Sequence, residues 1–144
     1  MAVGSAFDAP KVGRGCAFGD FDRDGDLDLL MTTNQGPAFL YRNNLANGFR
    51  SLRLRLTGVK SNRDAVGAVA RVSTPDGAQS RMVKTGSSYL SQSELTLTFG
   101  LGKRDSAQRV LIEWPSGLKQ EFQSVRAGAY QCTEGQKLSP MELA

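Results

Sequence analysis

Apolar and polar residues alternate with a period of two along most of the chain. Three leucines alternate with arginines in Leu52-Arg-Leu-Arg-Leu56, within the run Phe49–Leu56, and apolar residues alternate with threonines in Leu95–Phe99. Successive side chains of a strand point to opposite faces, so this period predicts strands and places Arg53 and Arg55 on a solvent face. No segment keeps the 3.6-residue period of an amphipathic helix.

The second part of the chain contains several more such runs. They predict short strands at Ala68–Val72, Arg81–Lys84, Val110–Trp114, Lys119–Phe122 and Ala129–Thr133. Turn residues separate them, most clearly in Thr74-Pro-Asp-Gly77 and Pro115-Ser-Gly117. About seven short strands with Gly, Pro and Asp turns predict an all-β fold, a β-sandwich or barrel-like domain over residues 48–138, with a tail at 139–144.

The first 47 residues predict a smaller unit. Strands are expected at Gly13–Phe18, Leu27–Thr32 and Ala38–Arg42, with a turn at Asn34-Gln-Gly-Pro37. Three strands bury little surface and should be marginally stable alone. We therefore expect residues 1–47 to pack on the second domain or to belong to a larger array.

An acidic segment joins the first two predicted strands. Asp20-Phe-Asp-Arg-Asp-Gly-Asp-Leu-Asp28 has an aspartate at every second position and a glycine at the sixth, where a loop around an ion needs a sharp turn. So many carboxylates repel one another unless a cation neutralises them. Calcium accepts 6–8 oxygen ligands in flexible geometry, whereas magnesium requires a tighter octahedron. We predict a Ca²⁺ site with the side chains of Asp20, Asp22, Asp24 and Asp28 and the main-chain carbonyl of Asp26.

This loop differs from an EF-hand. An EF-hand requires a bidentate glutamate at position 12 and two flanking helices, but Met31 occupies that position and the flanks have β character. Asp28, at position nine, is therefore expected to close the site. The alternative is a solvated acidic turn without metal. If an ion binds, its expected role is structural, because it would order a loop that has little core.

Charge and composition narrow the classes of function. The net charge of +4 divides into −2 for residues 1–47 and +6 for residues 48–144, and the basic excess forms no cluster with aromatic residues, so no nucleic-acid partner is expected. No apolar run approaches the roughly 20 residues of a membrane span.

The absence of histidine excludes Ser-His and Cys-His nucleophile pairs and the usual zinc sites. Cys16 and Cys132 could form a disulfide or remain two free thiols.

Several motifs resemble known families. Cys16-Ala-Phe-Gly-Asp-Phe-Asp-Arg-Asp-Gly-Asp-Leu-Asp-Leu29 resembles an FG-GAP/VCBS repeat, the calcium-loop repeat of integrin-type β-propellers, and Phe39-Leu-Tyr-Arg-Asn-Asn44 resembles the end of such a repeat. The sequence that follows resembles the ASPIC/UnbV domain of cartilage acidic protein-like and bacterial exported proteins. The matching pieces are Ser61-Asn-Arg-Asp-Ala-Val-Gly-Ala68, Gly86-Ser-Ser-Tyr-Leu-Ser-Gln92, Phe99-Gly-Leu-Gly102 and Ile112-Glu-Trp-Pro-Ser-Gly117.

The resemblance implies a propeller-type repeat followed by a β domain, calcium as the ion, and an extracellular or periplasmic location. Members of the family have several repeats upstream, whereas this chain has one, so we expect a C-terminal fragment of a longer exported protein. The N-terminus lacks the features of a signal peptide. The resemblance implies no reaction.

The predicted function is therefore a non-enzymatic, calcium-stabilised module for binding or adhesion, with a protein or glycan partner or self-association through exposed edge strands. One alternative is part of a glycan-processing or other hydrolytic enzyme that uses the loop aspartates or Glu113 and Glu121. Another is a purely structural propeller cap. Gly86–Ser93 could bind a glycan or phosphate, but its glycine and serines are also typical of a connecting loop. Trp114 is expected in the core, because it follows Val110 and Ile112 on one face.

Overall fold

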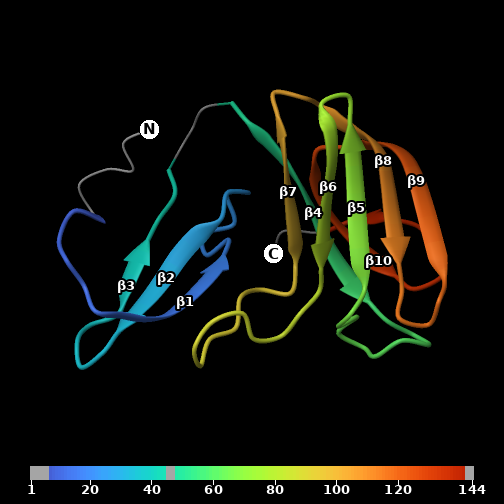
Figure 1. Ribbon diagram of the computed structural model, residues 1–144. Helices are drawn as coiled ribbons and strands as arrows, with labels where there is room; N and C mark the ends of the chain where they lie inside the picture. Colours follow the sequence, from blue (N-terminus) through green and yellow to red (C-terminus); the bar gives the residue numbers. More distant parts are fainter. Residues whose placement is uncertain (1–6, 45–47, 142–144) are drawn as a thin grey trace.

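The computed structural model describes residues 7–44 and 48–141. The elements in these ranges are the eleven strands β1 to β11. The first sheet has the order β1-β2-β3, formed by Gly13–Gly19, Asp28–Thr33 and Phe39–Tyr41. The second has the order β11-β10-β4-β7, formed by Ser139–Pro140, Gly128–Thr133, Arg50–Thr57 and Leu97–Gly102. The third has the order β6-β5-β8-β9, formed by Gly77–Met82, Val69–Thr74, Ser106–Glu113 and Lys119–Arg126. The all-β prediction is confirmed (Figure 1).

The two four-stranded sheets share one hydrophobic core. The alternating leucines of β4 and Phe99 of β7 pack against Val72 of β5 and against Val110 and Ile112 of β8. Trp114 is 3% exposed and belongs to the same core, as predicted. Within the described residues no sheet closes into a barrel. The two sheets are therefore called the sandwich below.

Strand β4 lies inside its sheet. It pairs antiparallel with β7 and parallel with β10, so that Leu54 lies opposite Leu97 on one side and Tyr130 on the other. One face of β4 carries the buried leucines Leu52, Leu54 and Leu56. The residues between them lie on the opposite face of the sheet, toward the first sheet.

The first sheet packs on the sandwich through the edge strand β1. The Cys16 and Phe18 amides each donate a hydrogen bond of 3.2 Å, to Ser88 Oγ and Ser93 Oγ respectively. In return the Glu94 amide donates to the carbonyl of Phe18 at 3.1 Å. Figure 1 shows the yellow segment between β6 and β7 beside β1. The small unit is therefore attached to the larger one, as expected for three strands that bury little surface.

A buried glutamate organises the loop that follows β4. Glu134 Oε2 accepts hydrogen bonds from three successive amides, Val59 and Lys60 at 2.7 Å and Ser61 at 2.8 Å. Its Oε1 accepts from the hydroxyls of Ser61 and Ser116. Burial opposes the charge of Glu134, but these hydrogen bonds lower its pKa to about 2.

Some boundaries differ from the predicted ones. Strand β6 begins at Gly77, four residues before the predicted start at Arg81, because it is a polar edge strand aligned by its hairpin with β5. Within the expected tail, β11 pairs with β10. The predicted unit boundary at residue 47 and the tail residues 142–144 lie outside the described residues. Where the structure describes the chain, no helix is long and apolar enough to cross a membrane.

Candidate metal centre

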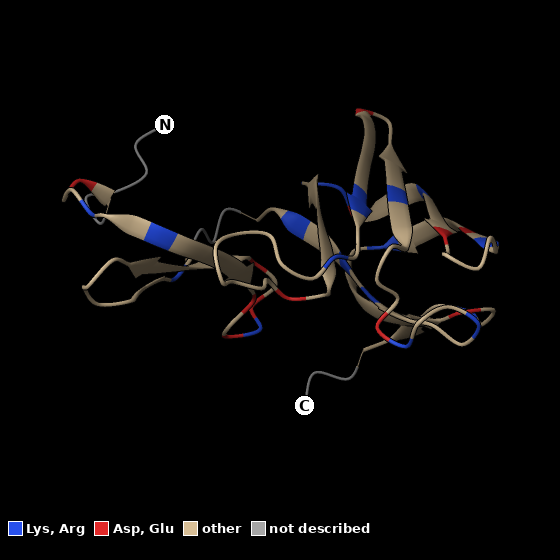
Figure 2. Cartoon of the chain, turned by 60° about the horizontal axis from the view of Figure 1, so that its bottom comes forward, with Lys and Arg blue, Asp and Glu red and all other residues tan. Residues whose placement is uncertain are grey.

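The acidic loop connects β1 to β2 where the first sheet meets the sandwich. Figure 2 shows acidic residues gathered at this junction, while Lys and Arg are spread over the chain. Carboxylates of the loop accept hydrogen bonds from its own amides: Gly25 to Asp20 Oδ2 at 3.1 Å, Asp24 to Asp22 Oδ1 at 3.3 Å, and Asp26 to Asp24 Oδ1 at 2.9 Å. Gly25 has φ +97°, a conformation that glycine adopts without steric cost. The loop is thus curled around its own carboxylates.

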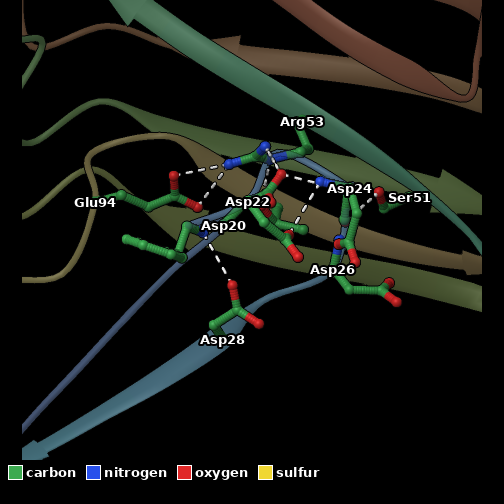
Figure 3. A network of polar contacts seen from close by, with 11 residues as sticks. Asp20, Asp22, Asp24, Asp26, Asp28, Ser51, Arg53 and Glu94 are labelled. Carbon is green, nitrogen blue, oxygen red and sulfur yellow. Dashed lines mark hydrogen bonds and ion pairs between the residues drawn. The ribbon is translucent and has the colours of Figure 1, made fainter. Parts of the chain in front are cut away.

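Asp28 is the first residue of β2 and is 3% exposed. Its Oδ2 accepts a hydrogen bond of 3.0 Å from the Phe21 amide, and its Oδ1 accepts one of 2.7 Å from the Asn43 amide. These bonds fix the carboxylate at the base of the loop and connect it to the chain beyond β3. Figure 3 shows Asp28 below the other loop aspartates. Asp28 therefore occupies the position from which a ninth-residue ligand would close the site.

Three of the five aspartates come together. Asp20, Asp22 and Asp28 each offer a carboxylate oxygen, and these oxygens lie within 4.8 Å of one another. The Asp20 side chain is fully buried, and its Oδ1 accepts no hydrogen bond. Asp22 Oδ2 is also buried without a hydrogen bond, although Arg42 Nε forms an ion pair with it at 2.5 Å. Buried carboxylate oxygens without donors are unfavourable, and a hard divalent cation with oxygen ligands would satisfy them.

Asp24 and Asp26 lie outside this cluster. The Asp24 side chain is exposed, and Figure 3 shows the Asp26 carboxylate turned away from Asp28. Burial, followed by the negative charges of the neighbouring aspartates, raises the pKa of Asp26. The main-chain carbonyl of Asp26 stays a predicted ligand, and Asp24 would have to rotate toward the cluster to act as a side-chain ligand.

Arg53 of β4 contacts the loop directly. Its Nη1 forms an ion pair with Asp20 Oδ2, and its Nη2 donates to Glu94 Oε1 at 2.9 Å and Oε2 at 2.7 Å. Its Nε donates to Thr98 Oγ1 at 3.3 Å. Figure 3 shows the guanidinium between the two carboxylates. Burial raises the pKa of Glu94, although the charge of Arg53 opposes that shift.

The prediction that Arg53 faces solvent is wrong. Arg53 is 6% exposed, because the acidic loop covers the face of β4 opposite the core. Arg55, two residues further on, is exposed as predicted. Sequence reasoning also missed Ser51, whose hydroxyl donates to the Gly25 carbonyl at 3.0 Å. The only sequence signal for the Arg53 contact is the excess negative charge of the loop, because clustered carboxylates favour a cationic side chain nearby. No sequence signal indicates the Ser51 contact.

The other candidate catalytic residues, Glu113 and Glu121, pair with basic residues and not with each other. Glu113 lies opposite Lys119 and Glu121 lies opposite Leu111, so the two glutamates do not face each other. Each carboxylate instead pairs with a basic residue, Glu113 with Lys119 and Glu121 with Arg109. A hydrogen bond from Lys119 lowers the pKa of Glu113.

The segment Gly86–Ser93 contacts the first sheet. Ser88 and Ser93, in the segment Gly86–Ser93, hold β1, and Ser88 and Ser91 pair as an isolated bridge. Cys16 is exposed, Cys132 is buried, and both are free thiols. Burial raises the pKa of Cys132 to about 11.

Known proteins resemble this chain over most of its length. A family model described as ASPIC and UnbV matches residues 58–138, which cover most of the sandwich but not the acidic loop. Cartilage acidic protein 1 from Homo sapiens is 35% identical over 123 residues, and so is the protein of that name from Mus musculus. The protein of that name from Xenopus tropicalis is 35% identical over 120 residues. Each match covers 79% of this chain and 18% of the relative, so the chain spans about a fifth of the length of these proteins.

Proposed function

The chain belongs to the ASPIC and UnbV family, and from this premise we propose that it is a non-enzymatic β module whose acidic loop binds one calcium ion. The observation that carries the proposal is the cluster of Asp20, Asp22 and Asp28 carboxylates, in which the buried Asp20 Oδ1 lacks a hydrogen-bond donor. The Asp26 carbonyl and, after rotation, Asp24 would complete an oxygen-only ligand set of the kind that calcium prefers.

The proposed role of the ion is to stabilise the loop. The Asp20 side chain and Asp28 are buried acids, and an ion that binds to the folded form alone would add to the free energy of unfolding. Aspartates that already coordinate a cation are poor acid–base catalysts, and Glu113 and Glu121 each form an ion pair with a basic residue. These features favour a structural ion over the hydrolytic alternative.

The first sheet is proposed to be a propeller-type FG-GAP/VCBS repeat. Its three antiparallel strands carry the acidic loop between β1 and β2, as in the repeat that residues 16–29 resemble. We further propose an extracellular or periplasmic location, because the resembled domain occurs in exported proteins and the relatives carry the name of an extracellular tissue, cartilage.

An exposed apolar face supports a binding role over that of a structural cap. Phe18, Phe21, Leu30 and Leu40 are between 39% and 73% exposed, and all four line a shallow hollow of about 300 Å³ beside the loop. Exposed apolar patches rimmed by polar groups are typical of sites that bind other proteins. We therefore propose a protein partner for this face.

Titration calorimetry tests the calcium proposal. The chain should bind one Ca²⁺ with a dissociation constant between about 10⁻⁷ and 10⁻³ M, and chelation should lower its melting temperature. Asp22→Ala should abolish or strongly weaken binding, because it removes one of the three clustered carboxylates. Asp8→Ala is the matched control, since Asp8 is an exposed aspartate outside the loop. Absence of binding by the wild type, or equal binding by the two variants, would refute the proposal.

A further inference from the structure

We propose that strand β4 of the sandwich is part of the calcium site: Ser51 and Arg53 position the acidic loop, so that ion binding and packing of the first sheet stabilise each other. This inference rests on the calcium-binding function proposed above. It assigns to two residues outside the loop a role that the loop motif itself does not reveal.

The two residues hold the loop at two separate points. Arg53 pairs with Asp20, the first position of the loop, and Ser51 Oγ donates to the carbonyl of Gly25, the sixth position, at 3.0 Å. Because Ser51 and Arg53 are two residues apart on one strand, they project from the same face of β4. The rigid strand thus fixes the spacing between the start of the loop and its sharp turn.

Arg53 also determines which oxygen of Asp20 is free. Oδ2 is occupied by the Arg53 guanidinium and by the Gly25 amide at 3.1 Å, whereas the buried Oδ1 has no hydrogen-bond partner. The carboxylate is thereby held in an orientation that leaves one oxygen for the cation. Arg53 is a positioning residue, because it acts on the ion only through Asp20. Partners of this kind typically change metal affinity 10–100-fold.

The charge of Arg53 alone would oppose calcium binding. Glu94 offsets it, because both of its carboxylate oxygens accept hydrogen bonds from Arg53 Nη2. With this charge balanced, the orientation of Asp20 is the larger effect of Arg53. The Glu94 amide also donates to the Phe18 carbonyl at 3.1 Å. The chain of contacts from Asp20 through Arg53 to Glu94 therefore ends in the backbone contact between the first sheet and the sandwich.

Calcium binding to the loop and packing of the first sheet on β4 must affect each other equally. If packing on β4 raises the calcium affinity of the loop by some factor, calcium must favour packing on β4 by the same factor. Calcium should therefore slow the opening of contacts between the first sheet and the sandwich, including those made by groups that do not touch the ion.

Calcium titration of the full chain tests the positioning role. Arg53→Met should weaken binding by about 10–100-fold, and Ser51→Ala should weaken it less. Arg55→Met is the matched control, because it removes the same charge from an exposed position on the same strand, and its affinity should be unchanged. Unchanged or tighter binding by Arg53→Met would overturn the inference. Ser51→Ala removes only one hydrogen bond, so it keeps the test informative if Arg53→Met folds poorly.

Hydrogen exchange of the Glu94 amide tests the coupling. Calcium should slow this exchange in the wild type, and the slowing should shrink in Ser51→Ala and Arg53→Met but persist in Arg55→Met. Equal slowing in all four proteins would overturn the inference while leaving calcium binding intact. If the wild type binds no calcium, the proposed function fails and this inference fails with it.

Discussion

Gly15→Ala should loosen the contact between the first sheet and the sandwich. Gly15 is buried in β1, where an added Cβ would overlap Ser91 Oγ and lie 2.7 Å from the Tyr89 carbonyl oxygen and 2.9 Å from Thr32 Oγ1. The hydroxyls can rotate, but the carbonyl cannot, so the segment between β6 and β7 must move away from β1. Inserting a methyl group into a packed site typically costs about 1–3 kcal/mol, which should lower the melting temperature by roughly 2–10 °C.

Gly13→Ala is the matched control. It lies on the same strand, and the nearest atom to its added Cβ is Met31 Sδ at 3.7 Å, an ordinary van der Waals distance. Neither glycine has the positive φ that would strain an alanine. Thermal melts followed by circular dichroism should therefore show a lower melting temperature for Gly15→Ala but not for Gly13→Ala. The Cys16 amide, which donates a hydrogen bond to Ser88, should exchange its hydrogen faster in Gly15→Ala. Equal melting temperatures for the two variants would refute the proposed contact.

Two further predictions concern the sandwich, and a third compares the cysteines of the two units. Phe99→Ala should lower the free energy of urea unfolding by about 3–5 kcal/mol because Phe99 is fully buried, whereas Phe21→Ala, at a 73% exposed site, should change it little. Glu134→Gln should destabilise the protein at pH 7. Because folding lowers the pKa of Glu134 from 4.5 to about 2, the stability it contributes is complete above pH 4.5 and is lost as the pH falls toward 2. The wild-type and variant unfolding curves should therefore converge over that range, and a constant difference would contradict this prediction. A thiol reagent should modify the exposed Cys16 in the native protein and the buried Cys132 only after unfolding, and two equally fast thiols would contradict the assigned burial.

Local pattern was sufficient to predict much of the fold. The leucines of Leu52-Arg-Leu-Arg-Leu56 are buried as their alternation predicts, because a strand in a sandwich has one face on the core. The sequence pattern predicts the bounds of strand β6 less accurately, because an exposed edge strand such as Gly77–Met82 needs no alternation of apolar residues. Its position depends on the hairpin with β5, and the short strand β11 depends on pairing with β10.

The candidate site could be predicted only in part. The aspartates are visible in the sequence because a calcium loop is a continuous segment. Arg53 lies 33 residues from Asp20, and Glu94 lies 41 residues from Arg53, so no local pattern relates them. An arginine between two leucines has the same pattern whether water or an acidic loop covers it. The three-dimensional packing of two separate sheets decides between these cases.

The parallel pairing of β4 with β10 has a consequence for biosynthesis. One side of β4 cannot form its hydrogen bonds until Gly128–Thr133 has left the ribosome, about 75 residues after β4 itself, which takes on the order of 4–15 s at typical translation speeds. During that interval the leucine-rich strand has an unpaired edge, which invites association with other nascent chains. Overexpression should therefore favour aggregation. A lower inducer concentration, at which fewer chains are synthesised at the same time, should increase the soluble yield.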